Sequence, residues 1–289
     1  MSVSGVVGQF AYFDTQLDHP HWRGKRVLDF GGNAGNLLRH ASPDLDPSNY
    51  WSIDLSLDGI EEGRRRHPGA NFVFYDRYNP QYNPSGKQGL PIPDVGVRFD
   101  IIVGYSVVNH LSQTELLQLV VELEALAADG GVIALSFVDP NWSIPEGWNE
   151  VFESGMTTLE RRVRQVNPSP DTANALLARA RDTARTTGLT WVTVSDIEDL
   201  RLGPEDHAWL EQQQSKRTNR IIRWRDAAPH EQTLYSTFCT SEYMRQLLPH
   251  AYIRPPVRPF IHHCAVIPAG STGLRWRRSM ICTGSRLPS

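Results

Sequence analysis

The sequence predicts an α/β fold: an open, mostly parallel sheet with an antiparallel last strand and helices on both faces. Short apolar, β-branched runs alternate with helical patterns over about the first 140 residues, which is typical of parallel βα units. The first run leads into a glycine-rich turn and then into helix. In open α/β folds such a turn lies at the carboxyl edge of the sheet, where ligands bind.

The first strand is expected at residues 26–30, followed by the turn Gly31-Gly32-Asn33-Ala34-Gly35. Glycine takes positive φ without steric cost and lets bare backbone approach a ligand. A dinucleotide turn, G-x-G-x-x-G counted from Gly31, would need glycine where Asn33 and Asn36 stand. The spacing therefore disfavours a nicotinamide-dependent oxidoreductase.

Three further parallel strands are expected at residues 50–55, 71–75 and 99–105. The first of these ends in the carboxylate of Asp54, roughly twenty residues after the glycine turn. Nucleotide-binding folds place there the acid that binds both ribose hydroxyls. Asp54 is therefore the predicted ribose ligand.

The next helix is predicted to begin at the capping box Ser112-Gln113-Thr114-Glu115 and to run to Ala128, where Gly130-Gly131 stops it. A fifth strand is expected at residues 132–138, because the run is β-branched and nearly uncharged. Asp139-Pro140 closes this strand.

These motifs resemble those of the class I S-adenosylmethionine-dependent methyltransferases, whose sheet is Rossmann-like. Read as acidic-x-Gly-x-x-x-Gly, the turn supplies Asp29, Gly31 and Gly35 of the family's motif I. It departs at Asn33, where the family often has glycine, but asparagine tolerates left-handed φ best among the other residues. Residues 106–111 look like motif IV and the segment beyond it.

The resemblance covers residues 1–140 and about 236–270, and it implies S-adenosyl-L-methionine as cofactor and S-adenosyl-L-homocysteine as product. Asp76 is expected near the adenine amino group. The cofactor-binding residues that the resemblance implies are Asp29, Gly31, Gly32, Asn33, Gly35, Asp54, Leu55, Asp76, Arg77, Tyr105 and Ser106.

Two residues are candidates for catalysis. His110 follows the fourth strand on the rim where the donor methyl should lie, and imidazole titrates near neutral pH, so it is the predicted general base. The alternative is that His110 packs under the cofactor, as comparable residues of the family do. Tyr12 lies in an aromatic N-terminal segment that could fold over the site as a lid and orient the acceptor; its alternative is helix packing.

Composition narrows the acceptor to a small molecule. A net charge of −3 and the absence of a basic stripe disfavour nucleic acid. The Asn-Pro-Pro-aromatic motif of adenine and cytosine amino methyltransferases is missing, so nucleic acid bases are poor candidates for the acceptor. No compact metal-ligand set is visible, so no metal is expected. The arginine-rich composition, the aromatic lid and His110 resemble bacterial natural-product methyltransferases.

These include enzymes that methylate indole C3 and trigger ring closure to pyrroloindolines, which is the specific hypothesis for the acceptor. An oxygen or nitrogen acceptor is the rival. A non-catalytic protein that only binds S-adenosylmethionine is the alternative of another class, because function depends on the site and not on the fold.

The expected organisation is an N-terminal lid (1–25), a cofactor-binding core (26–140), an insertion (141–235), the end of the core (236–270) and a tail (271–289). The insertion is predicted to cover the pocket or to join two copies in a homodimer. Within it, Ser169 should cap a helix that ends at Gly188, and residues 189–194 alternate like a strand. A capped helix at 240–248 and an antiparallel pair at 251–254 and 262–267 should complete the sheet.

No apolar run approaches the roughly twenty residues of a membrane helix, and the first residues lack the pattern of a signal peptide. The sequence therefore predicts a cytoplasmic protein that does not interact with membranes.

Overall fold

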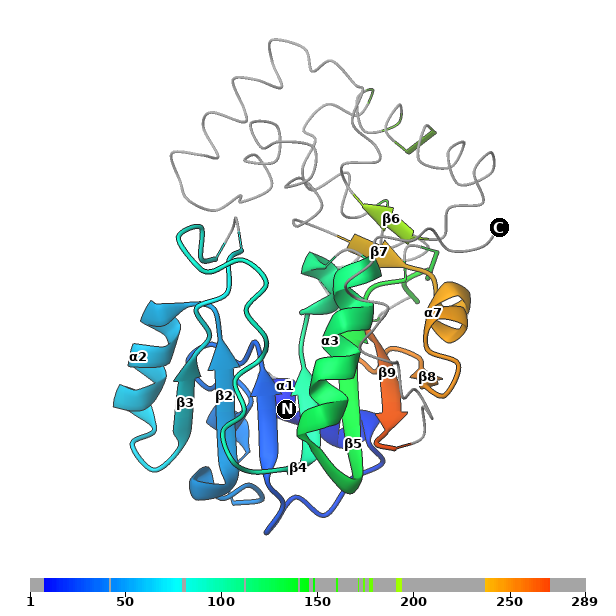
Figure 1. The fold of residues 1–289 in the computed structure, drawn as a ribbon. Helices are drawn as coiled ribbons and strands as arrows, with labels where there is room; N and C mark the ends of the chain where they lie inside the picture. Colours follow the sequence, from blue (N-terminus) through cyan, green and yellow to red (C-terminus); the bar gives the residue numbers. More distant parts are fainter. Residues whose placement is uncertain are drawn as a thin grey trace.

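A seven-stranded sheet lies at the centre of the part of the chain that the structure, a computed structural model, describes (Figure 1). The described residues are 8–41, 43–79, 82–111, 113–139, 141–145, 148, 160, 171, 174, 177–178, 191–193 and 237–270. The expected cap or dimer contact of residues 141–235 and the tail from residue 271 fall largely or wholly outside them.

The strand order is β3-β2-β1-β4-β5-β9-β8. Strands β1 to β5 pair in parallel, whereas β9 pairs antiparallel with both β5 and β8. The predicted fold class is therefore confirmed. The strands are β1 (Val27–Phe30), β2 (Tyr50–Asp54), β3 (Asn71–Phe74), β4 (Phe99–Gly104), β5 (Ala127–Phe137), β8 (Tyr252–Arg254) and β9 (His263–Pro268).

The chain starts the sheet at β1, builds outward through β2 and β3, and then returns to place β4 on the other side of β1. Because the direction of building reverses there, the loops after β1 and β4 diverge and leave a crevice at the carboxyl edge. The sheet topology thus places the glycine-rich turn at the position where open α/β folds bind their ligands.

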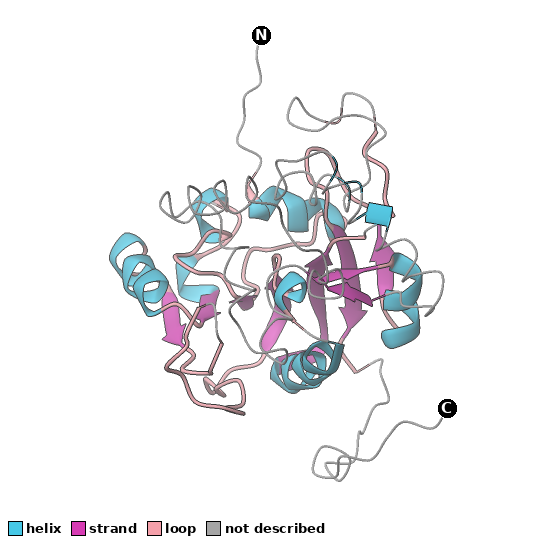
Figure 2. Cartoon of the chain, turned by 90° about the horizontal axis from the view of Figure 1, so that it is seen from above, coloured by secondary structure: helices cyan, strands magenta, loops and turns pink. Residues whose placement is uncertain are grey.

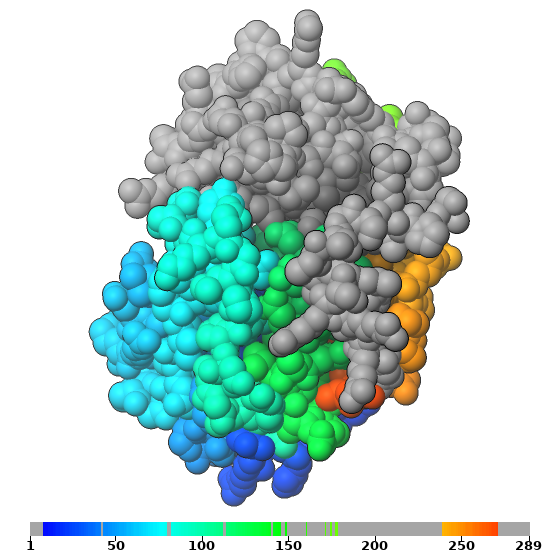
Figure 3. Space-filling view, in the orientation of Figure 1, coloured from blue at the N-terminus to red at the C-terminus, as the bar shows by residue number. Residues whose placement is uncertain are grey.

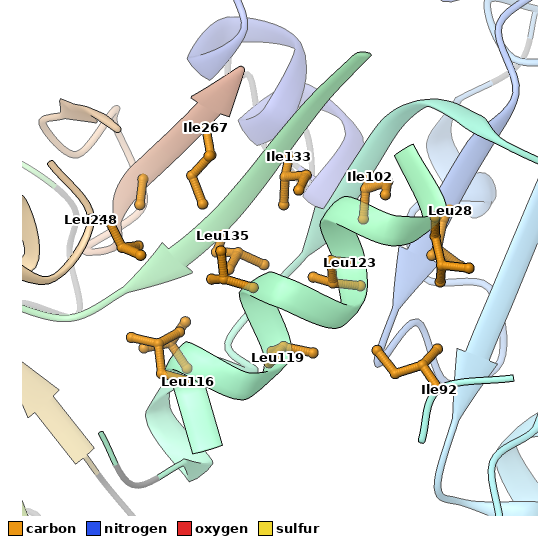
Figure 4. Close-up of a cluster of buried hydrophobic side chains, with 14 of the residues drawn as sticks. Leu28, Ile92, Ile102, Leu116, Leu119, Leu123, Ile133, Leu135, Leu248 and Ile267 are labelled. Atoms are coloured by element: carbon orange, nitrogen blue, oxygen red, sulfur yellow. The ribbon is translucent and has the colours of Figure 1, made fainter. Parts of the chain in front are cut away.

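Helices cover both faces of the sheet (Figures 1 and 2). On one face α3 (Gln113–Leu126) and α7 (Ser241–Leu247) pack on the strands, and Leu116, Leu119 and Leu123 of α3 meet Ile102, Ile133 and Leu135 of the sheet (Figure 4). On the other face lie α1 (Gln9–Gln16) and α2 (Leu57–Arg66). Burial of these apolar faces gives the sheet two hydrophobic layers.

The junction of α3 and β5 differs from the prediction. The helix ends at Leu126, and β5 begins at Ala127, which pairs with Phe99 of β4. The two glycines expected to separate helix and strand lie inside the strand, where Gly130 has a φ of 70°. A side chain on Gly131 would approach the Phe99 carbonyl oxygen to 2.9 Å. The glycines therefore allow β5 to continue past an irregularity in its pairing with β4.

The connection from β3 to β4 contains no helix among its described residues, 75–79 and 82–98. It is anchored by hydrogen bonds from the Tyr75 hydroxyl to the Leu90 carbonyl (2.6 Å) and from the Ile92 N–H to the Glu122 carboxylate of α3 (2.9 Å). In the space-filling view this connection (cyan) lies beside the green part of the chain that includes α3 (Figure 3). The connection therefore borders the carboxyl edge of the sheet.

The end of the core follows the prediction. Thr240 caps α7, accepting a hydrogen bond from the Tyr243 N–H, and β8 and β9 form the antiparallel pair. The strand expected in the insertion is present as β6 (Trp191–Thr193), and its partner, which was not predicted, is β7 (Thr237–Cys239). Of the helix expected from Ser169 to Gly188, residues 171, 174, 177 and 178 are helical and the rest lie outside the described residues.

Candidate active site

A cavity of about 400 Å³ opens at the carboxyl edge, between the loops that follow β1, β2, β3 and β4. This volume suits a small organic ligand. Eight of the predicted site residues line it: Gly31, Asn33, Asp54 and Leu55 after the first two strands, and Arg77, Tyr105, Ser106 and His110 after the next two.

The glycine-rich turn has the backbone conformation that its sequence predicts. Gly31 and Gly35 have φ angles of 75° and 83°, and Asn33 takes a left-handed φ of 50° in place of a glycine. The Gly31 N–H donates to the Ile53 carbonyl (2.8 Å), which ties the turn to β2. The turn therefore presents its backbone to the cavity in a fixed position.

Asp54 ends β2 and is held by two backbone donors. The Asn33 N–H donates to Oδ2 (2.8 Å) and the Ser56 N–H to Oδ1 (2.7 Å). Burial raises the pKa of Asp54, and these hydrogen bonds oppose the rise. A carboxylate has about four acceptor positions. Each oxygen of Asp54 can therefore also accept a hydrogen bond from a ligand hydroxyl in the cavity.

Asp29 lies beneath the turn and is buried. The Tyr50 hydroxyl donates to its Oδ2 (2.7 Å), and burial raises the pKa of Asp29 to about 7. A Cβ on Gly32 would lie 2.5 Å from the Asp29 carboxyl carbon, so Gly32 lets the turn pack on this side chain. Asp29 therefore supports the turn from below and does not line the cavity.

Asp76, like Asp29, Gly32 and Gly35, is not among the residues that line the cavity. Its carboxylate accepts from the Asn83 amide (3.2 Å) and pairs with the Lys87 ammonium (3.4 Å). These contacts lie within the connection from β3 to β4. In this structure Asp76 shapes that connection, and its neighbour Arg77 reaches the cavity instead.

His110 lies in the cavity wall, in a 3-10 turn at Val108–His110. Its ring meets the ring of Tyr82 edge to face, with centroids 5.5 Å apart, and its Nε2 lies 3.5 Å from the Tyr82 hydroxyl. The loop after β3 and the loop after β4 thus meet across the cavity through these two side chains.

Tyr12 is buried and lies outside the cavity, which departs from the lid prediction. Its hydroxyl donates to the His263 carbonyl (2.8 Å), and its ring packs on Tyr105 and Phe260. Helix α1 orients Tyr12 toward the sheet because its aromatic residues belong to the hydrophobic layer on that face. The N-terminal segment still reaches the cavity, but through Gln9.

Several cavity residues were not predicted. Tyr78, Asn79 and Tyr82 come from the connection between β3 and β4, and Glu115 and Leu119 come from α3. The asparagines and prolines of residues 79–84 indicate a loop, but loop composition carries no information about the direction in which the loop folds. Only its attachment to α3 brings these side chains to the cavity.

Residues 28–133 match the model of a methyltransferase domain family. This segment is similar to a methyltransferase domain, and its strands have the order of a Rossmann-like sheet. The match covers β1 to the middle of β5, and with them every cavity-lining residue except Gln9. The cofactor of this class of methyltransferase domain is S-adenosylmethionine.

The chain is also similar to individual methyltransferases. It is 26% identical to a fatty-acid O-methyltransferase of Mycolicibacterium smegmatis over 139 residues, which are 48% of this chain and 46% of that protein. The chain therefore matches about half the length of this relative.

Two solved structures are similar to parts of the chain. The amino pentose methyltransferase CalS10 of Micromonospora echinaspora is 24% identical, with a TM-score of 0.32 over 43% of this chain and 45% of that chain. The pyocyanin biosynthetic protein PhzM is 12% identical, with a TM-score of 0.44 over 90% of this chain and 54% of that chain.

The cavity of the methyltransferase domain fits S-adenosylmethionine. Asp54 lines the cavity at the end of β2, where its carboxylate oxygens would accept hydrogen bonds from ribose hydroxyls, and the backbone of Gly31 and Asn33 lies beside it. A Cβ on Gly31 would lie 2.8 Å from a Val107 methyl group, so this position admits backbone only. Leu55 and Tyr75 add apolar surface for the base next to Asp54.

Among the described residues, no group of three or more histidine, cysteine, aspartate or glutamate side chains could hold a metal ion. In the same part of the chain, no helix is both long and apolar enough to cross a membrane.

Proposed function

We propose that this chain transfers the methyl group of S-adenosylmethionine to a small-molecule acceptor. The observation that carries the proposal is the joint position of the glycine-rich turn and the Asp54 carboxylate on one cavity, inside a methyltransferase domain. S-adenosylmethionine supplies an activated methyl group when bound. The protein mainly has to hold the acceptor in line with this group and to remove a proton where the acceptor carries one.

The acceptor is proposed to be a natural product with an aromatic ring, with indole C3 as the specific hypothesis. The aromatic rings of Tyr78, Tyr82 and Tyr105 support this choice, because they offer flat surfaces to a planar acceptor. In that reaction the C2=C3 electron pair of the indole would form the bond from C3 to the methyl group, while the sulfur–methyl bond breaks and its electrons stay on the sulfur of the leaving S-adenosylhomocysteine. The side-chain nitrogen would then close onto the electron-poor C2, and a base would take the nitrogen's proton.

An oxygen acceptor is the main rival. The similarity to a fatty-acid O-methyltransferase supports it, since a carboxylate oxygen needs no base when it accepts a methyl group. The two alternatives differ in the need for His110, which lines the cavity and is the proposed base for an acceptor that must lose a proton.

The test is transfer of labelled methyl from S-adenosylmethionine to a panel of indoles, phenols, amines and fatty acids. A labelled product identifies the acceptor class, and a methylated pyrroloindoline supports the indole hypothesis. Tight binding of S-adenosylmethionine without any labelled product across the panel would contradict the proposal and favour a protein that only binds the cofactor.

If His110 is the base, His110→Gln should lower turnover of the identified acceptor by at least about 100-fold, the lower end of the range for loss of general-base catalysis. The affinity of the His110→Gln variant for S-adenosylhomocysteine should stay within about twofold of the wild-type value, since glutamine retains polar contacts in the cavity wall. The measurements are single-turnover rates and calorimetric titrations. Loss of cofactor affinity without a slower chemical step would instead assign His110 to the packing of the cofactor.

A further inference from the structure

The order of the strands assigns a direction to a ligand in the cavity. Asp54 ends β2, the glycine-rich turn follows β1, and Tyr105 with Ser106 follows β4, and these three strands are adjacent in the order β2-β1-β4. A ligand whose base packs on Leu55 and Tyr75 and whose ribose is bound by Asp54 would extend its sulfur and methyl group over the turn toward β4. The cavity wall at that end is formed by Tyr105 and Ser106.

The backbone at this end of the cavity is held in an uncommon conformation. Ser106 has a left-handed φ of 61°, which a residue other than glycine adopts rarely. Its N–H donates to the buried Ser136 hydroxyl (2.6 Å), and its hydroxyl accepts from the Asn109 amide (3.1 Å). Strain of this kind persists where the surroundings enforce it, and it often marks a functional position.

The side chain of Tyr105, the residue before Ser106, is held by contacts with other elements. Its hydroxyl lies 3.2 Å from Nδ1 of His262, the residue before β9, and the two ring centroids are 4.8 Å apart. The rings of Tyr12 and Phe13 contact it edge to face. Burial raises the pKa of Tyr105, so the phenol keeps its proton at neutral pH, and it donates a hydrogen bond to Nδ1 in the His262 tautomer that carries its proton on Nε2.

A phenol that donates its proton to His262 directs the remaining lone pairs of its oxygen elsewhere. Together with the negative face of the ring, this oxygen makes a surface that attracts a cation and has less effect on a neutral group. S-adenosylmethionine carries a positive sulfonium, whereas its product S-adenosylhomocysteine carries a neutral thioether. The two ligands differ at the end of the cavity where Tyr105 lies.

We propose that Tyr105, positioned by His262, is the wall that faces the sulfonium methyl and distinguishes the charged donor from the neutral product. The inference rests on the proposed function, because it takes S-adenosylmethionine as the ligand. Preference for the donor would help the product to leave after each turnover. No acceptor enters the argument, so the test requires none.

The experiment is calorimetric titration of the full chain with S-adenosylmethionine and, separately, with S-adenosylhomocysteine. Tyr105→Phe and His262→Leu should each weaken binding of S-adenosylmethionine by about 3- to 10-fold, which lies within the range for a contact between a cation and an aromatic side chain. Both should change the affinity for S-adenosylhomocysteine by less than twofold. His262→Asn, whose Oδ1 can replace Nδ1 as acceptor, should retain the wild-type preference.

Tyr252→Phe on β8 is the matched control, because this tyrosine is 65% exposed, and loss of its hydroxyl should change neither affinity. If Tyr105→Phe and His262→Leu lost equal affinity for both ligands, or lost affinity for neither, the inference would be overturned. If wild-type protein bound neither ligand, the proposed function itself would fail. Should His262→Leu not fold, Tyr105→Phe still decides the matter, because it removes only one oxygen atom.

Discussion

At the scale of single residues, two carboxyl groups with different tasks define the site. Asp54 lines the cavity and is held by two backbone N–H groups, whereas Asp29 is buried under the turn beside Tyr50. Burial raises the pKa of both. The resemblance implied both as cofactor residues, but only the structure shows that Asp54 lines the cavity and that Asp29 is buried beneath the turn.

Asp54→Ala should weaken binding of S-adenosylhomocysteine by about 1.5–3 kcal/mol, the range for hydrogen bonds to a charged group. The variant removes both carboxylate oxygens that we assign to the ribose. Calorimetric titration measures the loss, and Asp58→Ala, an exposed carboxylate in the first turn of α2, is the control. Wild-type affinity in Asp54→Ala would exclude Asp54 from the site.

Asp29 should make the cofactor-free protein less stable as the pH rises. Its pKa is about 7 in the folded chain, against about 3.9 in an unfolded chain. Between these values the folded state binds more protons, so the free energy of unfolding falls as the pH increases from about 4 to about 7. The stabilisation is complete below pH 4 and lost above pH 7.

Urea unfolding of wild type and Asp29→Asn across this range isolates the effect, because asparagine cannot ionise and can still accept the Tyr50 hydrogen bond. We expect the free energy of unfolding of the wild type to fall with rising pH relative to that of the variant. Parallel curves would show that Asp29 ionises in the folded chain at its ordinary pKa.

At the scale of elements, ends and connections determine which side chains reach the site. The 3-10 turn after β4 brings His110 to the cavity, and the connection between β3 and β4 brings Tyr82 to meet it. Helix α1 reaches the cavity through Gln9 at its first residue. The positions of β1 to β4 were predictable from the sequence pattern, whereas these connections follow from contacts between distant segments.

Thr240 begins the part of the core that closes the sheet, and its side chain caps α7. Thr240→Ala should lower the free energy of unfolding by about 1 kcal/mol, the usual cost of a lost N-cap. Thr240→Ser keeps the hydroxyl that accepts from the Tyr243 N–H and should stay close to wild type. Chemical denaturation measures both, and equal losses in the two variants would show that the methyl group, not the cap, matters.

At the scale of the whole molecule, the order β3-β2-β1-β4-β5-β9-β8 brings the site together. The lining residues from the ends of β1 to β4 are far apart along the chain, and they meet because parallel strands end at the same edge of the sheet. Apolar layers on both faces hold the strands in this order. A ligand in the cavity contacts several strand ends and should stabilise the entire core.

S-adenosylhomocysteine should therefore raise the melting temperature of the full chain. At a ligand concentration one hundred times the Kd, binding adds about 2.7 kcal/mol to the stability. NADH at the same concentration should have no effect, because the turn lacks the dinucleotide spacing. A thermal shift assay compares the two, and stabilisation by NADH alone would favour the oxidoreductase alternative.

The sequence by itself determined the βα order, the glycine-rich turn with its left-handed Asn33, the carboxylate at the end of β2 and the antiparallel closure of the sheet. Periodicity, capping residues and glycine spacing are local properties that are directly visible in a sequence. Only the tertiary structure decided that Tyr12 is buried and that Asp76 faces Lys87. It also decided that Tyr82 contacts His110 and that His262 contacts Tyr105. Those contacts join residues from separate elements, and side-chain direction there follows from packing and burial, which no local pattern encodes.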